Sequence, residues 1–143
     1  MRQQIVKPGE GPSYDWANDH LFIKAAGELS GGRVTLAEDT LKPGFHLPRH
    51  HHRAMTEIFY MLEGEAEFAF DDETVVATPR TTISVPPNVW HEVRCAKGGK
   101  LLTIFTPGGF DRYMVELAGL RAEQFANPEL MRRLAERYDI WNR

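Results

Sequence analysis

Four of the six histidines lie within seven positions, in the stretch FHLPRHHHRAMTEIFYMLEG of residues 45–64. Alternate side chains of an extended chain point to the same side, so His50 and His52 share a face that His51 does not. Glu57 follows after a short bend, and a turn of that size can bring its carboxylate beside the two imidazoles. Imidazole and carboxylate together are a ligand set for Fe, Mn, Ni, Co, Cu or Zn. The cluster therefore predicts a site for one divalent metal ion.

A third imidazole is available in the segment PPNVWHEV, where His91 begins a later strand directly after a proline-rich turn. His20 and His46 are interpreted as surface or core residues, because an isolated histidine is seldom a ligand. His51 is interpreted as non-ligating, because alternation turns it away from His50 and His52. Cys95 is the only cysteine. A thiolate zinc site and an internal disulfide are therefore both disfavoured.

The residues around this cluster predict a fold of many short strands. Apolar segments rich in Val, Ile, Thr and Phe recur between residues 21 and 106, separated by turn signals such as Gly31-Gly32 and Pro43-Gly44. The segments are 21–26, 33–41, 57–62, 65–70, 74–78, 82–85, 91–95 and 100–106. Strands in this number without intervening helices predict an all-β fold, either an antiparallel sandwich or a small barrel.

The two ends of the chain differ from this middle. Residues 1–20 contain Pro-Gly and Gly-Pro steps and predict an N-terminal arm that is mostly loop or one edge strand, whereas residues 21–107 form the predicted barrel. Residues 108–143 predict a short helical tail, because FDRYMVELAGL has helical spacing and Asn127 can cap a second helix that begins at Pro128. We expect these helices to pack on the outside of the barrel as cover, with gating of a pocket or dimer formation as alternatives.

Composition and charge exclude several classes of function. A chain of 143 residues is a single domain by length. The net charge of -3 provides no basic surface for nucleic acid, and no apolar run is long enough to span a membrane. The N-terminal residues lack an apolar signal core, so the expected location is cytoplasmic.

The histidine stretch resembles the first sequence motif of the cupin superfamily, G-x5-H-x-H-x4-E-x6-G. All its fixed positions are filled here, by Gly44, His50, His52, Glu57 and Gly64. Five fixed residues at four fixed spacings make this resemblance specific.

The second cupin motif, G-x5-P-x-G-x2-H-x3-N, is matched in part. Pro86 and His91 are in place, whereas Arg80, Asn88 and Cys95 stand where Gly, Gly and Asn are usual. Asn88 tolerates the positive backbone angle that glycine would supply. The departures therefore affect the turns more than the metal site, because the histidine is kept.

The resemblance spans roughly residues 30–107 and implies a double-stranded β-helix, the jelly-roll barrel of cupins. It also implies that His50, His52, Glu57 and His91 hold one divalent metal ion in the lumen. The helical tail is similar to that of single-domain cupins grouped with quercetin dioxygenases.

The strands that carry the ligands also predict a substrate pocket. If Glu57 points inward, strand alternation places Phe59 and Met61 inward as well. On the second motif strand, Val93 and Cys95 would face the same lumen. A mostly apolar pocket of this kind suits a small, flat, partly hydrophobic organic ligand that offers one or two oxygens to the metal.

By the same resemblance, the expected function is that of a metal-dependent dioxygenase that acts on a small enolisable or phenolic, flavonol-like substrate with dioxygen. Glu57 would be the catalytic residue, as both metal ligand and general base. One alternative is a non-redox lyase, isomerase or polyketide cyclase with the same ligands, and another is a small-molecule-binding cupin without catalysis. The arm is expected to add a strand to a neighbouring subunit in a homodimer, and neither nucleic acid nor membrane is expected as a partner.

Overall fold

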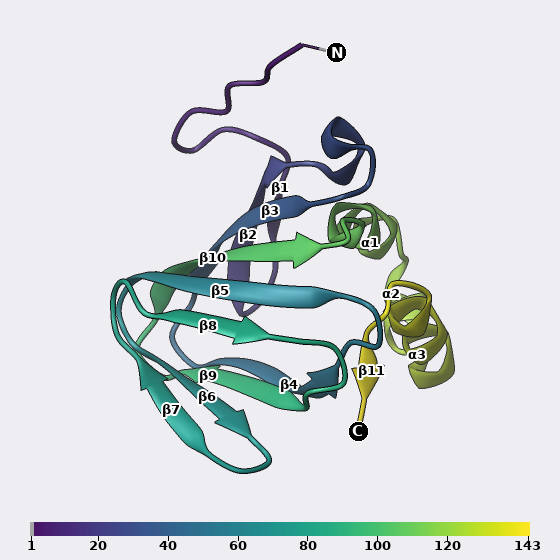
Figure 1. Cartoon of the computed structure of the whole chain (residues 1–143). Helices are drawn as coiled ribbons and strands as arrows, with labels where there is room; N and C mark the ends of the chain where they lie inside the picture. Colours follow the sequence, from purple (N-terminus) through teal and green to yellow (C-terminus); the bar gives the residue numbers. More distant parts are fainter. Residues whose placement is uncertain (1) are drawn as a thin grey trace.

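Two antiparallel sheets face each other in the structure, a computed structural model that describes residues 2–143 (Figure 1). Met1, the first residue of the predicted arm, lies outside the described residues. The first sheet has the strand order β1 (Ser13–Asp15), β2 (Asp19–Ala25), β3 (Thr35–Leu41), β10 (Gly99–Thr106), β5 (Thr56–Glu63), β8 (Thr82–Val85). The second has the order β11 (Trp141–Asn142), β4 (Phe45–His51), β9 (His91–Cys95), β6 (Ala66–Phe70), β7 (Thr74–Ala77).

The helices are few and lie mainly in the tail. A short 3-10 turn covers Gly27–Ser30, and the α-helices are α1 (Phe110–Ala118), α2 (Ala122–Phe125) and α3 (Pro128–Arg137). No helix in the described part of the chain is long and apolar enough to cross a membrane. The architecture confirms the predicted all-β jelly roll with a short C-terminal helical tail.

Strand alternation builds the interior between the sheets. Every second residue is buried in β3 from Thr35 to Leu41, in β5 from Glu57 to Met61, and in β10 from Leu101 to Phe105. Because β10 lies between β3 and β5, the buried faces of these three strands form one continuous inner wall. This wall carries one of the predicted ligands, Glu57.

The buried apolar side chains form two clusters. One fills the space between the two sheets and includes Phe59, Met61, Phe68, Val93 and Cys95. The other joins the first sheet to the tail helices and includes Leu21, Ile23, Phe105, Met114 and Leu134. The tail therefore packs on the sandwich through a hydrophobic core of its own.

The tail helices begin where the sequence predicts. The α1 helix starts at Phe110 and buries Met114 and Leu117. Asn127 caps α3, because its side-chain oxygen accepts a hydrogen bond from the Leu130 N–H at 3.2 Å, and Pro128 occupies the first helical turn. These features confirm the predicted start of the second helix, with Asn127 as its cap.

Two strands were not assigned from the sequence. The β4 strand contains the histidine run, whose polar residues lack the apolar alternation that marks a strand. The β11 strand is only two residues long and lies in the predicted helical tail, where it pairs with β4 through Trp141–His51 and Asn142–His50. The chain thus ends as a strand of the second sheet, beside the histidine stretch (Figure 1).

Candidate metal centre

Strand pairing brings the four predicted ligands together. The β4 and β9 strands are neighbours in the second sheet, with His50 directly opposite His91, and His52 follows the end of β4. Glu57 comes from the start of β5 in the facing sheet. All four side chains are buried, and their ligand atoms lie within 4.8 Å of one another. The cluster therefore lies between the sheets and could hold a metal ion.

The other three histidines lie outside this cluster. His51 turns to the opposite side of β4 and contacts Trp90, with ring centroids 4.2 Å apart. His46 Nε2 lies 2.5 Å from a carboxylate oxygen of Glu92. His20 takes no part in the group of buried ligands. His51 thus lies on the opposite side of the strand from His50 and His52, as strand alternation predicts.

Backbone carbonyls set the tautomer of each imidazole in the cluster. A carbonyl oxygen can only accept, so each Nδ1 must carry the proton that it donates. The three bonds run from His50 to the Pro48 oxygen (2.8 Å), from His52 to the Asp139 oxygen (2.7 Å) and from His91 to the Val89 oxygen (2.9 Å). With Nδ1 protonated, the Nε2 lone pair of each neutral ring is free to bind a metal ion.

The free Nε2 atoms converge on one carboxylate oxygen. Glu57 Oε1 lies 3.2 Å from His52 Nε2 and 3.1 Å from His91 Nε2. Neutral imidazole Nε2 and carboxylate oxygen are both acceptors, so this arrangement needs a positive charge between them. Two ligand atoms bound at about 2.1 Å and at right angles to one ion would lie about 3.0 Å apart. The cluster fits a metal ion, because a single proton cannot serve all four ligands at once.

Burial and mutual contact set the charges of these side chains. Burial, reinforced by the neighbouring His91, lowers the pKa of His50 to about 4, so His50 is neutral at pH 7. Burial by itself would raise the pKa of Glu57, but hydrogen bonds with His52 and His91 outweigh it and lower that pKa to about 2. Burial likewise lowers the pKa of His52, yet the bond to Glu57 and its charge raise it overall. A proton therefore competes with a metal ion for His52 as the pH falls.

The turns around the ligands explain the departures from the second cupin motif. Arg80 and Asn88 have φ values of 72° and 67°, in the left-handed region that glycine ordinarily occupies. Asn88 accepts this conformation at little cost, and its N–H donates to the His52 backbone oxygen at 2.6 Å. The replacement therefore preserves the turn that leads to His91.

Asp139 ties the C-terminal tail to the segment between the ligands. One of its carboxylate oxygens accepts from the Arg53 N–H at 2.7 Å, and the other accepts from the Ala54 and Met55 N–H groups at 2.8 Å each. Its backbone oxygen is the partner of His52 Nδ1. One residue of the tail thus orients a ligand and holds the bend between His52 and Glu57. No local pattern in the sequence points to Asp139, because its partners lie more than 80 residues away.

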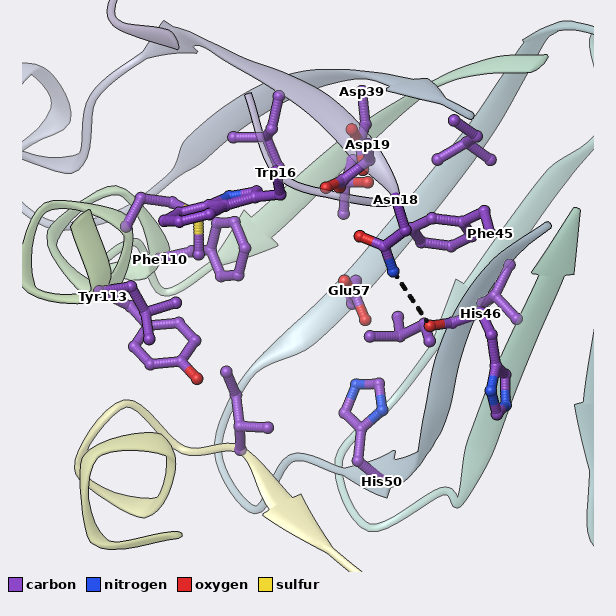
Figure 2. A pocket seen from close by; sticks show the side chains of 18 of the residues that line it. Trp16, Asn18, Asp19, Asp39, Phe45, His46, His50, Glu57, Phe110 and Tyr113 are labelled. Atoms are coloured by element: carbon purple, nitrogen blue, oxygen red, sulfur yellow. Dashed lines mark hydrogen bonds between the residues drawn. The ribbon is translucent and has the colours of Figure 1, made fainter. Parts of the chain in front are cut away.

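The ligands open into a cavity of about 330 Å³. Figure 2 shows Trp16, Phe110 and Tyr113 along one side of it and Phe45 on the other. Glu57 and His50, two of the four ligands, point into the space between these walls (Figure 2). The cavity lining is therefore mostly apolar, with aromatic rings on both sides of the ligand cluster.

The four predicted pocket residues divide into two pairs. Phe59 and Val93 line the cavity. Met61 and Cys95 are buried but are not among its lining residues; they lie in the core between the sheets. Alternation places all four on the inward face, yet Met61 and Cys95 pack in the core with Phe68, whose ring lies edge-on to Phe59 with centroids 4.9 Å apart. Neighbouring side chains of this core therefore separate Met61 and Cys95 from the cavity.

Several cavity residues were missed because they come from segments assigned to other roles. The predicted arm contributes Trp16, Asn18 and Asp19, and the tail contributes helix residues and Ile140. Asp39 also lines the cavity, and the sequence carries a signal for it, because strand alternation puts Asp39 on the same face as Thr35 and Ala37. A charged residue at a strand position that faces the interior indicates a polar site there.

Comparison with known proteins agrees with the fold and the ligand pattern. Residues 37–106 match the family model described as the cupin domain. The quercetin 2,3-dioxygenase of Bacillus subtilis (strain 168) is 26% identical over 110 residues, which cover 76% of this chain and 33% of that protein. The chain thus spans about a third of the length of this relative.

Solved structures share the fold at low sequence identity. An RmlC-like cupin from Shewanella frigidimarina NCIMB 400 superposes with a TM-score of 0.66 at 20% identity, covering 77% of this chain and 96% of that chain. A predicted oxalate decarboxylase from Thermotoga maritima superposes with a TM-score of 0.67 at 18% identity, covering 73% of this chain and 99% of that chain. The family match over residues 37–106 and the filled first motif identify a cupin domain in this chain, and the solved structures share its jelly-roll fold.

Proposed function

We propose that the protein is a metal-dependent dioxygenase that acts on a small enolisable or phenolic, flavonol-like substrate. The observation that carries the proposal is the convergence of three imidazoles and one carboxylate, with their Nε2 lone pairs free, at the wall of an apolar cavity. Four protein ligands leave one or two positions open on an ion that prefers five or six, and an open position is typical of catalytic sites. The similarity to quercetin 2,3-dioxygenase supports the same choice.

In this proposal His50, His52, Glu57 and His91 hold one divalent ion of Fe, Mn, Ni, Co, Cu or Zn. When bound, the ion would supply Lewis acidity that stabilises the anion of a substrate hydroxyl group. Glu57 is the general base as well as a ligand: it is ionised, because its pKa is lowered to about 2, and it can accept the hydroxyl proton. A base of such low pKa accepts that proton only from a hydroxyl whose acidity the site itself has raised.

The walls of the cavity serve the same chemistry. Phe45, Phe59 and Phe110 offer apolar surface to a flat aromatic ligand. They also exclude water from the ligand cluster, which strengthens electrostatic interactions with a bound anion. Dioxygen is the second substrate of the proposed reaction.

The first experiment is elemental analysis of untagged protein purified without chelators, together with oxygen-electrode assays on flavonols. We expect about one redox-active metal ion per chain, lost in His52→Ala, and oxygen consumption that requires both metal and flavonol. Glu57→Gln, which keeps an oxygen ligand but removes the base, should retain part of the metal and lose turnover. Absence of metal in wild-type protein, even after reconstitution, would overturn the metal assignment.

A non-redox reaction is the second candidate. A ligand set of imidazole nitrogens and a carboxylate oxygen also suits Zn²⁺. With Zn²⁺ the same site would catalyse a lyase, isomerase or cyclase reaction by Lewis acidity alone. A structural relative named as a predicted oxalate decarboxylase indicates that the fold accommodates other chemistry. Turnover at the same rate under nitrogen would favour this candidate, and a spectral shift of the ligand without turnover would favour a binding protein.

We also propose that the protein forms a homodimer through its N-terminal arm. The β1 strand ends the first sheet, and Ile5, which precedes it, is 78% exposed. An unpaired strand edge next to an exposed apolar side chain is suited to pairing with a second copy. Sedimentation analysis of the full chain beside a variant lacking residues 2–10 tests this: a wild-type monomer contradicts it.

A further inference from the structure

A second buried polar cluster lines the same cavity, away from the metal ligands. Asp19 begins β2 and Asp39 lies in β3, and they are only 8% and 7% exposed. Asp19 is paired with Leu41 and Asp39 with Leu21, so the two carboxyl groups lie on the inward face diagonally across the β2–β3 pair. Figure 2 shows the two carboxyl groups side by side, facing the space that contains Glu57.

The two carboxyl groups are close enough for each to affect the pKa of the other, and a hydrogen bond between them requires that one of them carries a proton. Asp39 Oδ1 is buried and has no conventional hydrogen-bond partner in residues 2–143. Burial, together with the bond to Asp19 and its charge, raises the pKa of Asp39 to about 9. Asp39 therefore carries a proton at neutral pH.

No salt bridge within residues 2–143 includes Asp19 or Asp39. Lys42 is close enough to affect Asp19, but its Nζ donates instead to Asp15 Oδ1 and to the Trp16 backbone oxygen, at 2.6 Å each. Its charge lowers the pKa of Asp19 but does not overcome the effect of burial. Two buried acids without a paired cation destabilise a fold, so packing alone gives no reason for their presence in a cavity wall.

We propose that Asp19 and Asp39 form a second anchor for the substrate, which binds a hydroxyl group remote from the metal ligands. This inference rests on the proposed function in taking the substrate to lie in this cavity. The pair offers acceptor oxygens, including the unpartnered Asp39 Oδ1, and a hydroxyl group can donate to them. A substrate with an acidic oxygen at one end and a hydroxyl group at the other would contact both clusters.

The sheet register separates the two anchors. Asp39 lies opposite Leu101 of β10, and Glu57 lies opposite Phe105 of the same strand. These positions are four residues apart, which is roughly 13 Å along a strand. The two clusters therefore contact different parts of a ligand, and the apolar body between them lies against Thr103 and Phe59, which also line the cavity.

The test compares the affinity of metal-loaded protein for the parent flavonol and for its derivatives with one further hydroxyl group. We expect the best derivative to bind about tenfold more tightly than the parent, because one additional hydrogen bond contributes about that factor. This preference should disappear in Asp39→Leu and in Asp19→Ala, and the second variant decides if the first does not fold. Asp72→Leu, which removes an exposed carboxylate from a hairpin outside the cavity, is the matched control.

The outcomes separate this inference from the proposed function. If the derivatives keep the same preference in wild-type protein and in both pair variants, the second anchor is overturned and the metal-binding mode stands. If no flavonol binds, the proposed function fails, and phenol with toluene as its isostere becomes the probe of the pair. Preference for phenol that is retained in His52→Ala and lost in Asp39→Leu supports the anchor, and preference that survives in Asp39→Leu overturns it.

Discussion

The two buried polar clusters of the cavity meet the cost of desolvation in opposite ways. At the histidine cluster, acceptor atoms converge within 4.8 Å and need a cation from outside. At the aspartate pair, Asp39 avoids a buried charge by keeping its proton, because its pKa is raised to about 9. The first cluster is therefore matched to an ion, whereas the second is matched to a neutral group that shares hydrogen bonds.

The clusters also differ in how firmly they are held. Each imidazole is oriented by a backbone carbonyl, from Pro48, Asp139 or Val89. The aspartates have no such support beyond each other, and one oxygen of Asp39 lacks a partner among the described residues. Preorganisation suits metal coordination, which demands fixed geometry. The aspartate pair, in contrast, has an acceptor oxygen that is free to bind a ligand.

The largest expected effect comes from removal of a metal ligand. His52→Ala should weaken binding of a divalent ion by at least about 100-fold, because one of four ligands and its oriented lone pair are lost. His51→Ala is the control next to it, since His51 turns toward Trp90 on the other face of β4. Calorimetric titration with Mn²⁺ or Zn²⁺ measures both. Equal affinity in the two variants would show that the cluster is not the binding site.

A smaller effect is expected when the support of the cluster is removed. Asp139→Ala deletes the acceptor of three backbone N–H groups, so metal affinity should fall about tenfold and stability by about 2 kcal/mol. Asp111→Ala is the matched control, because Asp111 also accepts from a distant backbone N–H, at Gly27, and from the Thr35 hydroxyl group. It should lower stability and leave metal affinity unchanged; a loss of metal affinity in both variants would contradict a positioning role for Asp139.

The proton of the aspartate pair predicts a pH dependence of stability. The pKa of Asp39 is about 9 in the folded chain against a model value of 3.8, so folding takes up a proton between these pH values. Stability from this group is therefore present below about pH 4 and lost as the pH rises toward 9. Asp39→Asn should be more stable than wild-type protein at pH 8, by about 1 kcal/mol or more.

Urea unfolding of both proteins at pH 5 and pH 8 measures this difference. The advantage of the variant should shrink at pH 5, where protonating Asp39 costs less free energy. An advantage of equal size at both pH values would mean that Asp39 is not protonated on folding.

The smallest effect is expected in the core beyond the cavity. Cys95→Ala should lower stability by about 1 kcal/mol, because it removes a fully buried small side chain. It should leave metal and ligand affinity unchanged, because Cys95 does not line the cavity. Val93→Ala, one inward position away on β9, is the contrast, since Val93 lines the cavity. A ligand affinity that falls in Cys95→Ala would extend the pocket into the core.

The candidate ligands could be predicted because their grouping is encoded locally. His50 and His52 share a face by strand alternation, and Glu57 follows at a distance that one bend can close. His91 required the resemblance to cupins, since nothing local connects it to the other three. The depth of the pocket could not be predicted in this way: alternation places Met61 and Cys95 inward, but only packing determines where the filled core begins.

The sequence by itself determined the all-β class, the helical tail and the residue types of the metal centre, because strand period, turns, caps and motif spacing are short-range properties. Tertiary structure alone decided the rest of the cavity. Asp19 comes from the arm and Asp39 from β3, and Asp139 reaches His52 across 87 positions. Such contacts depend on which strands become neighbours and on how the tail packs against them. Both are set by the burial of apolar surface over the whole chain and not by any local pattern.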